Sequence, residues 1–121
     1  MYSPQVLEHF ENPRNTGVVE NADASAQLEN PVCGDVLKLT ARIASGRVSE
    51  IKFLAKGCVP SIACASALTD LAKGKTLGEV HALTTEQLTA EVGWLPQASS
   101  HAAQLAIDAL STMLRDCRQG Q

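Results

Sequence analysis

Two stretches of alternating apolar and polar residues predict a β-hairpin. Apolar side chains occupy every second position over residues 37–43, and they do so again at Ile51, Phe53 and Ala55. This period of two is typical of strands that bury one face. Ser45 and Gly46 lie between the stretches and supply the turn.

The hairpin can pair in two registers, and both bring two cysteines to its open end. A symmetric two-residue loop would place Cys33 opposite Cys58. Matching the apolar faces instead pairs Leu39 with Phe53 through a three-residue loop. That register sets Cys33 opposite Val59. In either case the two thiols leave the same end, with their Cβ atoms roughly 5 to 8 Å apart.

Helical periodicity and capping residues predict the remaining elements. A short helix follows the cap Ser3, with Val6, Leu7 and Phe10 on its apolar side. The other expected elements are a weak edge strand over 24–28, a helix from Pro60 to Gly74, short helices over 76–82 and 84–92, and a last helix from Ser99 or Ser100 toward the terminus. The predicted fold class is α+β: a small antiparallel three-stranded sheet with helices packed on one face, in a single domain over 1–121.

Size and composition favour a compact cytoplasmic protein. The chain has 121 residues, of which 45% are hydrophobic, so one core should suffice without disulfides. It has no apolar run of membrane-spanning length, and its polar start lacks the layout of a signal peptide. In a reducing compartment, the four cysteines are expected to be free, buried or metal-bound.

Charge and aromatic content argue against a nucleic-acid partner. The net charge is −3, and Lys73 and Lys75 are the basic residues between Ser61 and Leu114, against five acidic ones. Phosphate binding relies on clustered Lys and Arg. Aromatic residues make up 3% of the chain, which is too few for base stacking.

Cys58 has the strongest chemical signal. It lies between Gly57 and Pro60, before a predicted helix whose positive end favours thiolate over thiol. Cys33 lies in a similar break, and Asp35 could add a hard oxygen ligand beside the soft sulfur atoms. The plainer interpretations are a buried turn cysteine and an aspartate that starts a strand.

The other two cysteines are weaker candidates for a metal site. Cys64 could supply an additional thiolate, but it shares a helical stripe with Ala65 and Leu68, which favours core packing. Cys117 follows His101 by sixteen residues, or about 24 Å along a continuous helix. It therefore cannot share an ion with that histidine.

The chain resembles the U-type iron–sulfur cluster scaffolds, the IscU and NifU N-terminal family, in four segments. These are YSPQVLEHFENPRNTG, NPVCGDVLKL, the AKGC turn with its helix, and LPQASSHAAQLAIDAL. The resemblance implies a non-enzymatic α+β scaffold for a labile [2Fe–2S] cluster, with a cysteine desulfurase and acceptor proteins as partners. The family's ligand positions correspond to Cys33, Asp35, Cys58 and His101, while His9 and His81 are expected at the surface.

The chain departs from the family pattern at two places. Ala102 stands where the family has its third cluster cysteine, and only the first two residues of the chaperone-recognised LPPVK segment are kept, at Leu95 and Pro96. The second departure gives no support for a dedicated heat-shock chaperone. The first leaves two alternatives open: a Zn²⁺ site of two cysteines, one histidine and one aspartate, or a sulfurtransferase with Cys58 as the sulfur acceptor.

Overall fold

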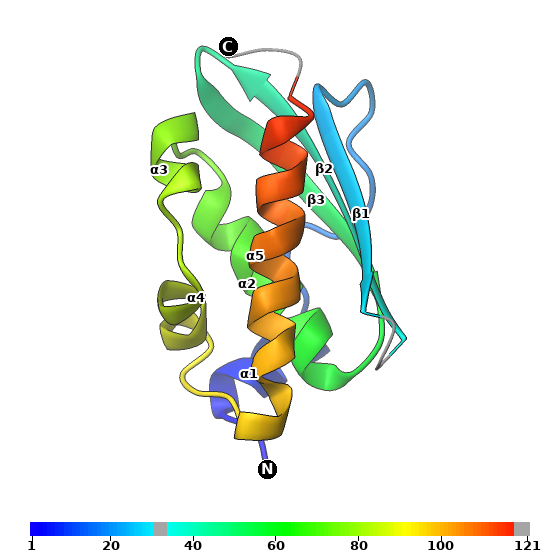
Figure 1. Cartoon of the computed structure of the whole chain (residues 1–121), viewed down its shortest axis with the longest axis vertical. Coiled ribbons are helices and arrows are strands. Elements are labelled where there is room, and N and C mark those ends of the chain that lie inside the picture. The colour runs from blue at the N-terminus through cyan, green and yellow to red at the C-terminus, as the bar shows by residue number, and fades with distance from the viewer. Residues whose placement is uncertain (31–33, 118–121) are drawn as a thin grey trace.

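A three-stranded antiparallel sheet forms one layer of the molecule (Figure 1). The computed structural model describes residues 1–30 and 34–117. The strands are β1 (Ala24–Asn30), β2 (Asp35–Ala44) and β3 (Arg47–Lys56), in the spatial order β1-β2-β3. The predicted sheet is confirmed, including the edge strand.

A two-residue turn and a face-matched register coexist in the β2–β3 hairpin. Ser45 and Gly46 have φ values of 55° and 72°, as a tight two-residue turn requires. Leu39 nevertheless pairs with Phe53, the register that matches the apolar faces. The predicted pairing was therefore correct, but the three-residue loop expected to accompany it was wrong.

A β-bulge reconciles the tight turn with that register. Arg42 pairs with Glu50, whereas Ile43 pairs with Val48, so Ser49 has no partner across the hairpin. The Ser49 hydroxyl donates to the Arg42 carbonyl at 3.0 Å. The extra residue shifts the pairing by one position and keeps the apolar side chains of both strands facing the core.

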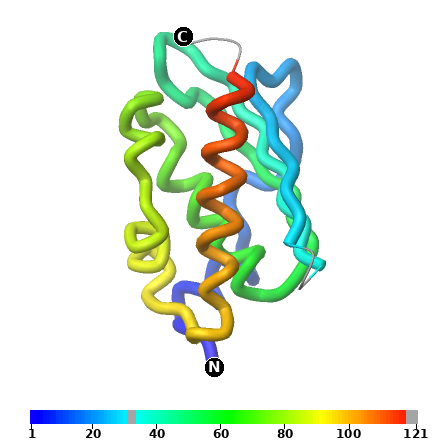
Figure 2. The backbone as a smooth tube through the Cα atoms, viewed as in Figure 1, coloured from blue at the N-terminus to red at the C-terminus, as the bar shows by residue number. Residues whose placement is uncertain are grey.

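The helices form the second layer. They are α1 (Pro4–Glu11), α2 (Val59–Ala72), α3 (Leu77–His81), α4 (Thr85–Glu91) and α5 (Ser100–Arg115), with the 3₁₀ turn η1 (Gln97–Ser99) before α5. In Figures 1 and 2, α2 and α5 lie along one face of the sheet, with α3 and α4 beside them. Among the described residues, no helix combines the length and apolar character needed to cross a membrane.

The core lies between the sheet and the two long helices. One buried cluster includes Leu39 and Ile51 of the sheet, Leu68 of α2 and Met113 of α5, each with at most 1% of its surface exposed. Helix α2 is buried almost all round, because α1 and α5 pack against it as well as the sheet. The sequence predicted burial of a single stripe of this helix, the one that contains Cys64, Ala65 and Leu68, but most of the helix surface is buried.

Helix α1 buries only part of the apolar side predicted for it. Leu7 and Phe10 remain 42% and 38% exposed, whereas Val6 and His9 are buried. His9 Nδ1 lies 2.8 Å from the Ser66 hydroxyl of α2. The expectation that His9 lies at the surface was wrong because this polar contact satisfies its ring inside the helix interface, while His81 is exposed as expected.

The segment after α1 pairs with the free edge of β3. The Phe53 N–H donates to the Asn15 carbonyl, and the Gly17 N–H donates to the Phe53 carbonyl, both at 2.9 Å. Val19 then crosses to Thr40, whose hydroxyl accepts its N–H at 2.9 Å. The segment between α1 and β1 therefore protects the sheet edge.

Candidate metal centre

Three metal-ligating side chains from distant parts of the chain converge at one end of the molecule. Asp35 Oδ2 lies 3.2 Å from His101 Nε2 and 3.7 Å from Cys58 Sγ. The distance from Cys58 Sγ to His101 Nε2 is 4.0 Å. Donor atoms of all three residues lie within 4.8 Å of one another, a spacing suited to ligands around a single ion.

Each donor stands at the end of an element that faces this corner. Asp35 is the first residue of β2, Cys58 is the N-cap of α2, and His101 lies in the first turn of α5. Figure 1 shows the starts of both helices and the open end of the β2–β3 hairpin at the lower end of the molecule. The hairpin and the helix layer together therefore create the site.

Gly57 allows the chain to pass over the Asp35 side chain. Its φ is +151°, and a Cβ built on it would lie 2.1 Å from Asp35 Oδ1. Real Cβ atoms do not approach other atoms this closely, and L residues rarely adopt such a φ. A glycine is therefore required where β3 leads into the Cys58 turn.

Asp35 is almost completely buried, with 1% of its surface exposed, and both of its carboxylate oxygens have partners. Oδ1 accepts the Cys58 backbone N–H at 3.2 Å, and Oδ2 accepts the Ser61 hydroxyl at 2.7 Å. Burial by itself would raise the pKa of Asp35, but hydrogen bonds from Ser61, Cys58 and His101 lower it overall. The carboxylate is therefore held ionised, as a metal ligand must be.

Cys58 is partly exposed at the amino end of α2. Its backbone is extended, with φ −78° and ψ 166°, and its side chain caps no helix N–H. The sulfur atom is thus directed at its neighbours in the site rather than back into its own helix, and lies 3.2 Å from Ser61 Oγ. A sulfur at this position benefits from the helix dipole when it is ionised.

The remaining cysteines differ in position. Cys33 lies outside the described residues. Cys64 is fully buried in the core, where desolvation, followed by repulsion from Cys58, raises its pKa to about 12. Such a thiol is not available as a thiolate ligand, so its position favours the core-packing interpretation. Cys117 is buried just beyond the far end of α5.

Ala102, at the family's third-cysteine position, is itself buried, with 1% of its surface exposed. It offers no donor atom. Ser61 and Gly57, by contrast, contact the site but were not among the predicted ligands. The available signal was a serine three residues after Cys58, at the N3 position of a helix, where a side chain lies beside the N-cap.

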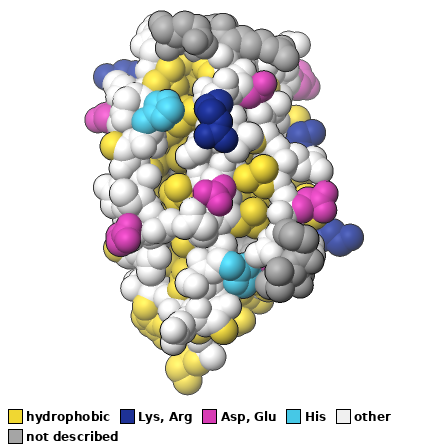
Figure 3. Space-filling model, in the orientation of Figure 1, with side chains coloured by type: hydrophobic (Ala, Val, Ile, Leu, Met, Phe, Trp, Pro, Cys, Tyr) yellow, Lys and Arg dark blue, Asp and Glu magenta, His cyan; other side chains and the backbone are white. Residues whose placement is uncertain are grey.

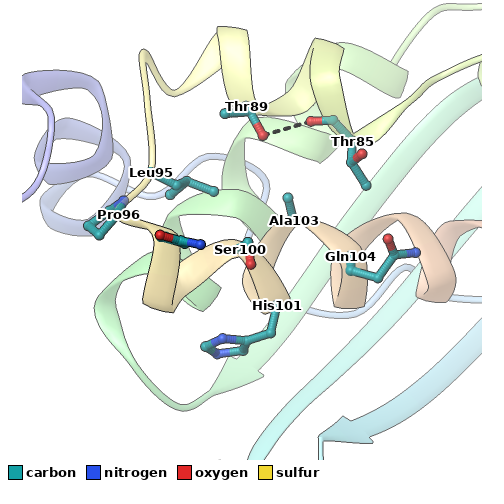
Figure 4. A pocket seen from close by; sticks show the side chains of 9 residues that line it. Thr85, Thr89, Leu95, Pro96, Ser100, His101, Ala103 and Gln104 are labelled. Carbon is teal, nitrogen blue, oxygen red and sulfur yellow. Dashed lines mark hydrogen bonds between the residues drawn. The ribbon is translucent and has the colours of Figure 1, made fainter.

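A hollow of about 470 Å³ opens beside His101, between α4 and the start of α5 (Figure 4). Its lining is mostly uncharged, with Thr85 and Thr89 on one side and Ser100 and Gln104 on the other. On the face of the molecule drawn in Figure 3, acidic and basic side chains are scattered among hydrophobic ones. The site thus adjoins an open, largely neutral surface.

Comparison with known proteins identifies the family. Residues 1–120 match the family model described as the NifU-like N terminal domain. The chain belongs to this NifU-like family. The iron–sulfur cluster assembly scaffold protein IscU 1 of Archaeoglobus fulgidus is 40% identical over 116 residues, which cover 96% of this chain and 76% of the relative.

Further relatives agree with this assignment. The scaffold protein IscU of Escherichia coli K12 is 36% identical over 119 residues, covering 95% of this NifU-like chain and 92% of the relative. The crystal structure of a NifU-like protein (N-terminal) from Brucella abortus matches with a TM-score of 0.75 at 21% identity, covering 93% and 91% of the two chains. That structure supports the fold, and the predicted α+β class is confirmed.

Proposed function

We propose that this protein is an iron–sulfur cluster assembly scaffold that binds a labile [2Fe–2S] cluster, or its iron, through Cys33, Asp35, Cys58 and His101. The observation that carries the proposal is the convergence of Asp35, Cys58 and His101 within 4.8 Å. Family membership and relatives named as scaffolds, matched over 76% and 92% of their length, support it. The protein acts as a carrier and not as an enzyme.

The donor set is suited to cargo that must leave again. Thiolates hold iron–sulfur clusters most firmly, and a histidine ligand is a known but less common substitute. A hard carboxylate oxygen beside soft sulfur binds iron less tenaciously than a full thiolate set. With Ala102 in place of a cysteine, at most two thiolates, those of Cys33 and Cys58, are offered at these positions. Release is therefore favoured over permanent retention.

The proposed role requires two kinds of partner. A cysteine desulfurase would supply the sulfur, and acceptor proteins would receive the finished cluster. Cys58 is partly exposed at the amino end of α2, where a donor protein could reach its sulfur atom.

Anaerobic reconstitution with ferrous iron and sulfide tests the proposal. The wild-type protein should develop sulfide-to-iron charge-transfer absorption, and Cys58→Ala or Cys33→Ala should abolish most of it. Cys117→Ala is the matched control, because that cysteine lies beyond the other end of α5. Failure of the wild-type protein to develop the absorption would refute the scaffold role.

A second candidate function, a zinc-binding partner of a desulfurase, is favoured by one observation. The three described donors are spaced as ligands on one ion, and Cys33 would complete a tetrahedral set of two cysteines, one histidine and one aspartate. Metal and sulfide analysis of protein purified without air separates the two functions. Stoichiometric zinc without iron or sulfide would favour the second, and iron with sulfide would favour the first.

A further inference from the structure

Ser61 is the one polar side chain of α2 that contacts two of the site's donor residues. It occupies the N3 position, three residues after the N-cap Cys58, and only 6% of its surface is exposed. Its hydroxyl donates to Asp35 Oδ2 at 2.7 Å. Its oxygen also lies 3.2 Å from Cys58 Sγ.

Because the single hydroxyl proton of Ser61 is given to Asp35, the direction of the second contact follows. Ser61 Oγ can only accept from the neutral Cys58 thiol, whose S–H has Ser61 Oγ at 3.2 Å and Asp35 Oδ2 at 3.7 Å as available acceptors. When a metal ion takes the place of that proton, the hydrogen bond from the S–H is lost and the sulfur can face the ion. The hydrogen bond from the Ser61 hydroxyl to Asp35 Oδ2 can stay in place when the metal binds.

The two carboxylate oxygens of Asp35 have different neighbours. Oδ1 is turned toward the amino end of α2, where it accepts the Cys58 N–H. Oδ2 accepts the Ser61 hydroxyl and also lies 3.2 Å from His101 Nε2 and 3.7 Å from Cys58 Sγ. The carboxylate is therefore presented to the gap between sulfur and imidazole through a single oxygen.

We propose that Ser61 is a positioning residue for metal binding: its hydroxyl fixes the Asp35 carboxylate so that Oδ2 binds the ion in a monodentate manner beside Cys58 and His101. Outer-shell hydrogen bonds of this kind commonly govern metal affinity, and their removal weakens binding about 10-fold to 100-fold. This inference deepens the proposed function and rests on the same site.

The test is titration of the folded protein with Co²⁺, an ion that reports its ligands by absorption. Ser61→Ala should weaken Co²⁺ binding at least about 10-fold and shift the d–d bands, since the carboxylate is no longer held in place. Alanine favours the helix at least as well as serine, so α2 should still form. Far-ultraviolet circular dichroism verifies that it does.

Ser66→Ala is the matched control. Ser66 is a fully buried serine of the same helix, but its hydroxyl contacts His9 Nδ1 and the Arg14 N–H, away from the site. This variant should lower thermal stability while leaving Co²⁺ affinity and spectrum unchanged. The proposal is overturned if Ser61→Ala binds Co²⁺ like the wild-type protein, if Ser66→Ala weakens binding as much, or if the wild-type protein binds no Co²⁺.

The same variants separate this inference from the scaffold function. If the wild-type protein assembles a cluster and Ser61→Ala matches it in both cluster assembly and Co²⁺ binding, the role of Ser61 fails and the scaffold function stands. If the wild-type protein assembles no cluster but Ser61→Ala still weakens and shifts Co²⁺ binding, the scaffold function fails and the role of Ser61 stands.

Discussion

His101 Nε2 lies 3.2 Å from Asp35 Oδ2, although the two residues are 66 positions apart in the chain. The contact joins the first turn of α5 to the first residue of β2. Asp35 is buried and His101 remains partly exposed, so the imidazole lies at the outer side of the site. Metal binding should therefore depend on both partners, and removal of the imidazole should disturb the fold little.

Replacing His101 by alanine should weaken Co²⁺ or Zn²⁺ binding by at least about 10-fold, because one ligand is removed while the chain still folds. Competition titration with a chelating dye measures the change. His81→Ala is the control, since His81 is an exposed helical histidine distant from the donors. Equal affinities for the His101 and His81 variants would contradict the assignment.

Gly57→Ala should damage both the fold and the site. The new Cβ would collide with Asp35 Oδ1, and the backbone conformation is strained for any L side chain. We expect a loss of about 1–3 kcal/mol in the free energy of unfolding, together with weaker metal binding. Urea denaturation and Co²⁺ titration measure the two effects.

The control for this prediction is Gly46→Ala in the distal turn. Gly46 also has a positive φ, of +72°, but a Cβ there would meet nothing within 4 Å. It should therefore lose stability from backbone strain alone and retain its metal affinity. If both alanine variants bind metal equally well, the close approach of Gly57 to Asp35 does not matter for the site.

The free energy of unfolding should fall in mild acid, because His9 is buried in its neutral form. Burial, followed by the positive charge of Arg14, lowers the pKa of His9 below its usual value near 6.5. The unfolded chain then binds a proton at a higher pH than the folded one. The contribution of His9 is therefore fully present above about pH 6.5 and is lost as the pH falls through the folded-state pKa.

Urea midpoints measured from pH 8 down to pH 5 test this prediction. His9→Gln should flatten the decline in stability between about pH 6.5 and pH 5, because the titrating ring is gone. His81→Gln should follow the wild-type curve. A wild-type slope retained in His9→Gln would show that other groups cause the acid sensitivity.

Cys58 and Cys64 should differ sharply in alkylation. Cys58 is partly exposed at a helix amino end, whereas Cys64 is buried with its pKa raised to about 12. Iodoacetamide should modify Cys58 in the native protein and reach Cys64 only after unfolding, as peptide mass spectrometry can measure. Bound Zn²⁺ should protect Cys58. Native-state labelling of Cys64 at the same rate would contradict the observed packing.

Local signals explain why most elements could be predicted from the sequence. The helices predicted over 76–82 and 84–92 are present as α3 and α4, and capping boxes of Thr76 with Glu79 and of Thr84 with Gln87 start them. The alternating strands were likewise evident from residue type, whereas residue type left two registers open for their pairing. Such signals depend on neighbours three or four positions away, which a single chain displays directly.

Tertiary contacts account for the errors. His9 can be buried because its Nδ1 shares a hydrogen bond with the hydroxyl of Ser66, which lies 57 residues away in the chain. No pattern within α1 reveals that partner. Leu7 and Phe10 are exposed because α2 covers the opposite side of the helix. The convergence of Asp35, Cys58 and His101 was expected from the family resemblance. The role proposed for Ser61 was not, because it depends on the orientation of the Ser61 side chain toward Asp35.

The bulge at Ser49 lets the turn of the hairpin and the pairing at its open end follow different registers. The turn at Ser45 and Gly46 can be tight, while pairing nearer the site follows the register that serves the core. Changes in length confined to the distal loop need not propagate to Asp35 and Cys58. Insertions at that tip should therefore disturb the start of α3, whose Leu77 N–H donates to the Gly46 carbonyl at 3.0 Å, before they move the ligands.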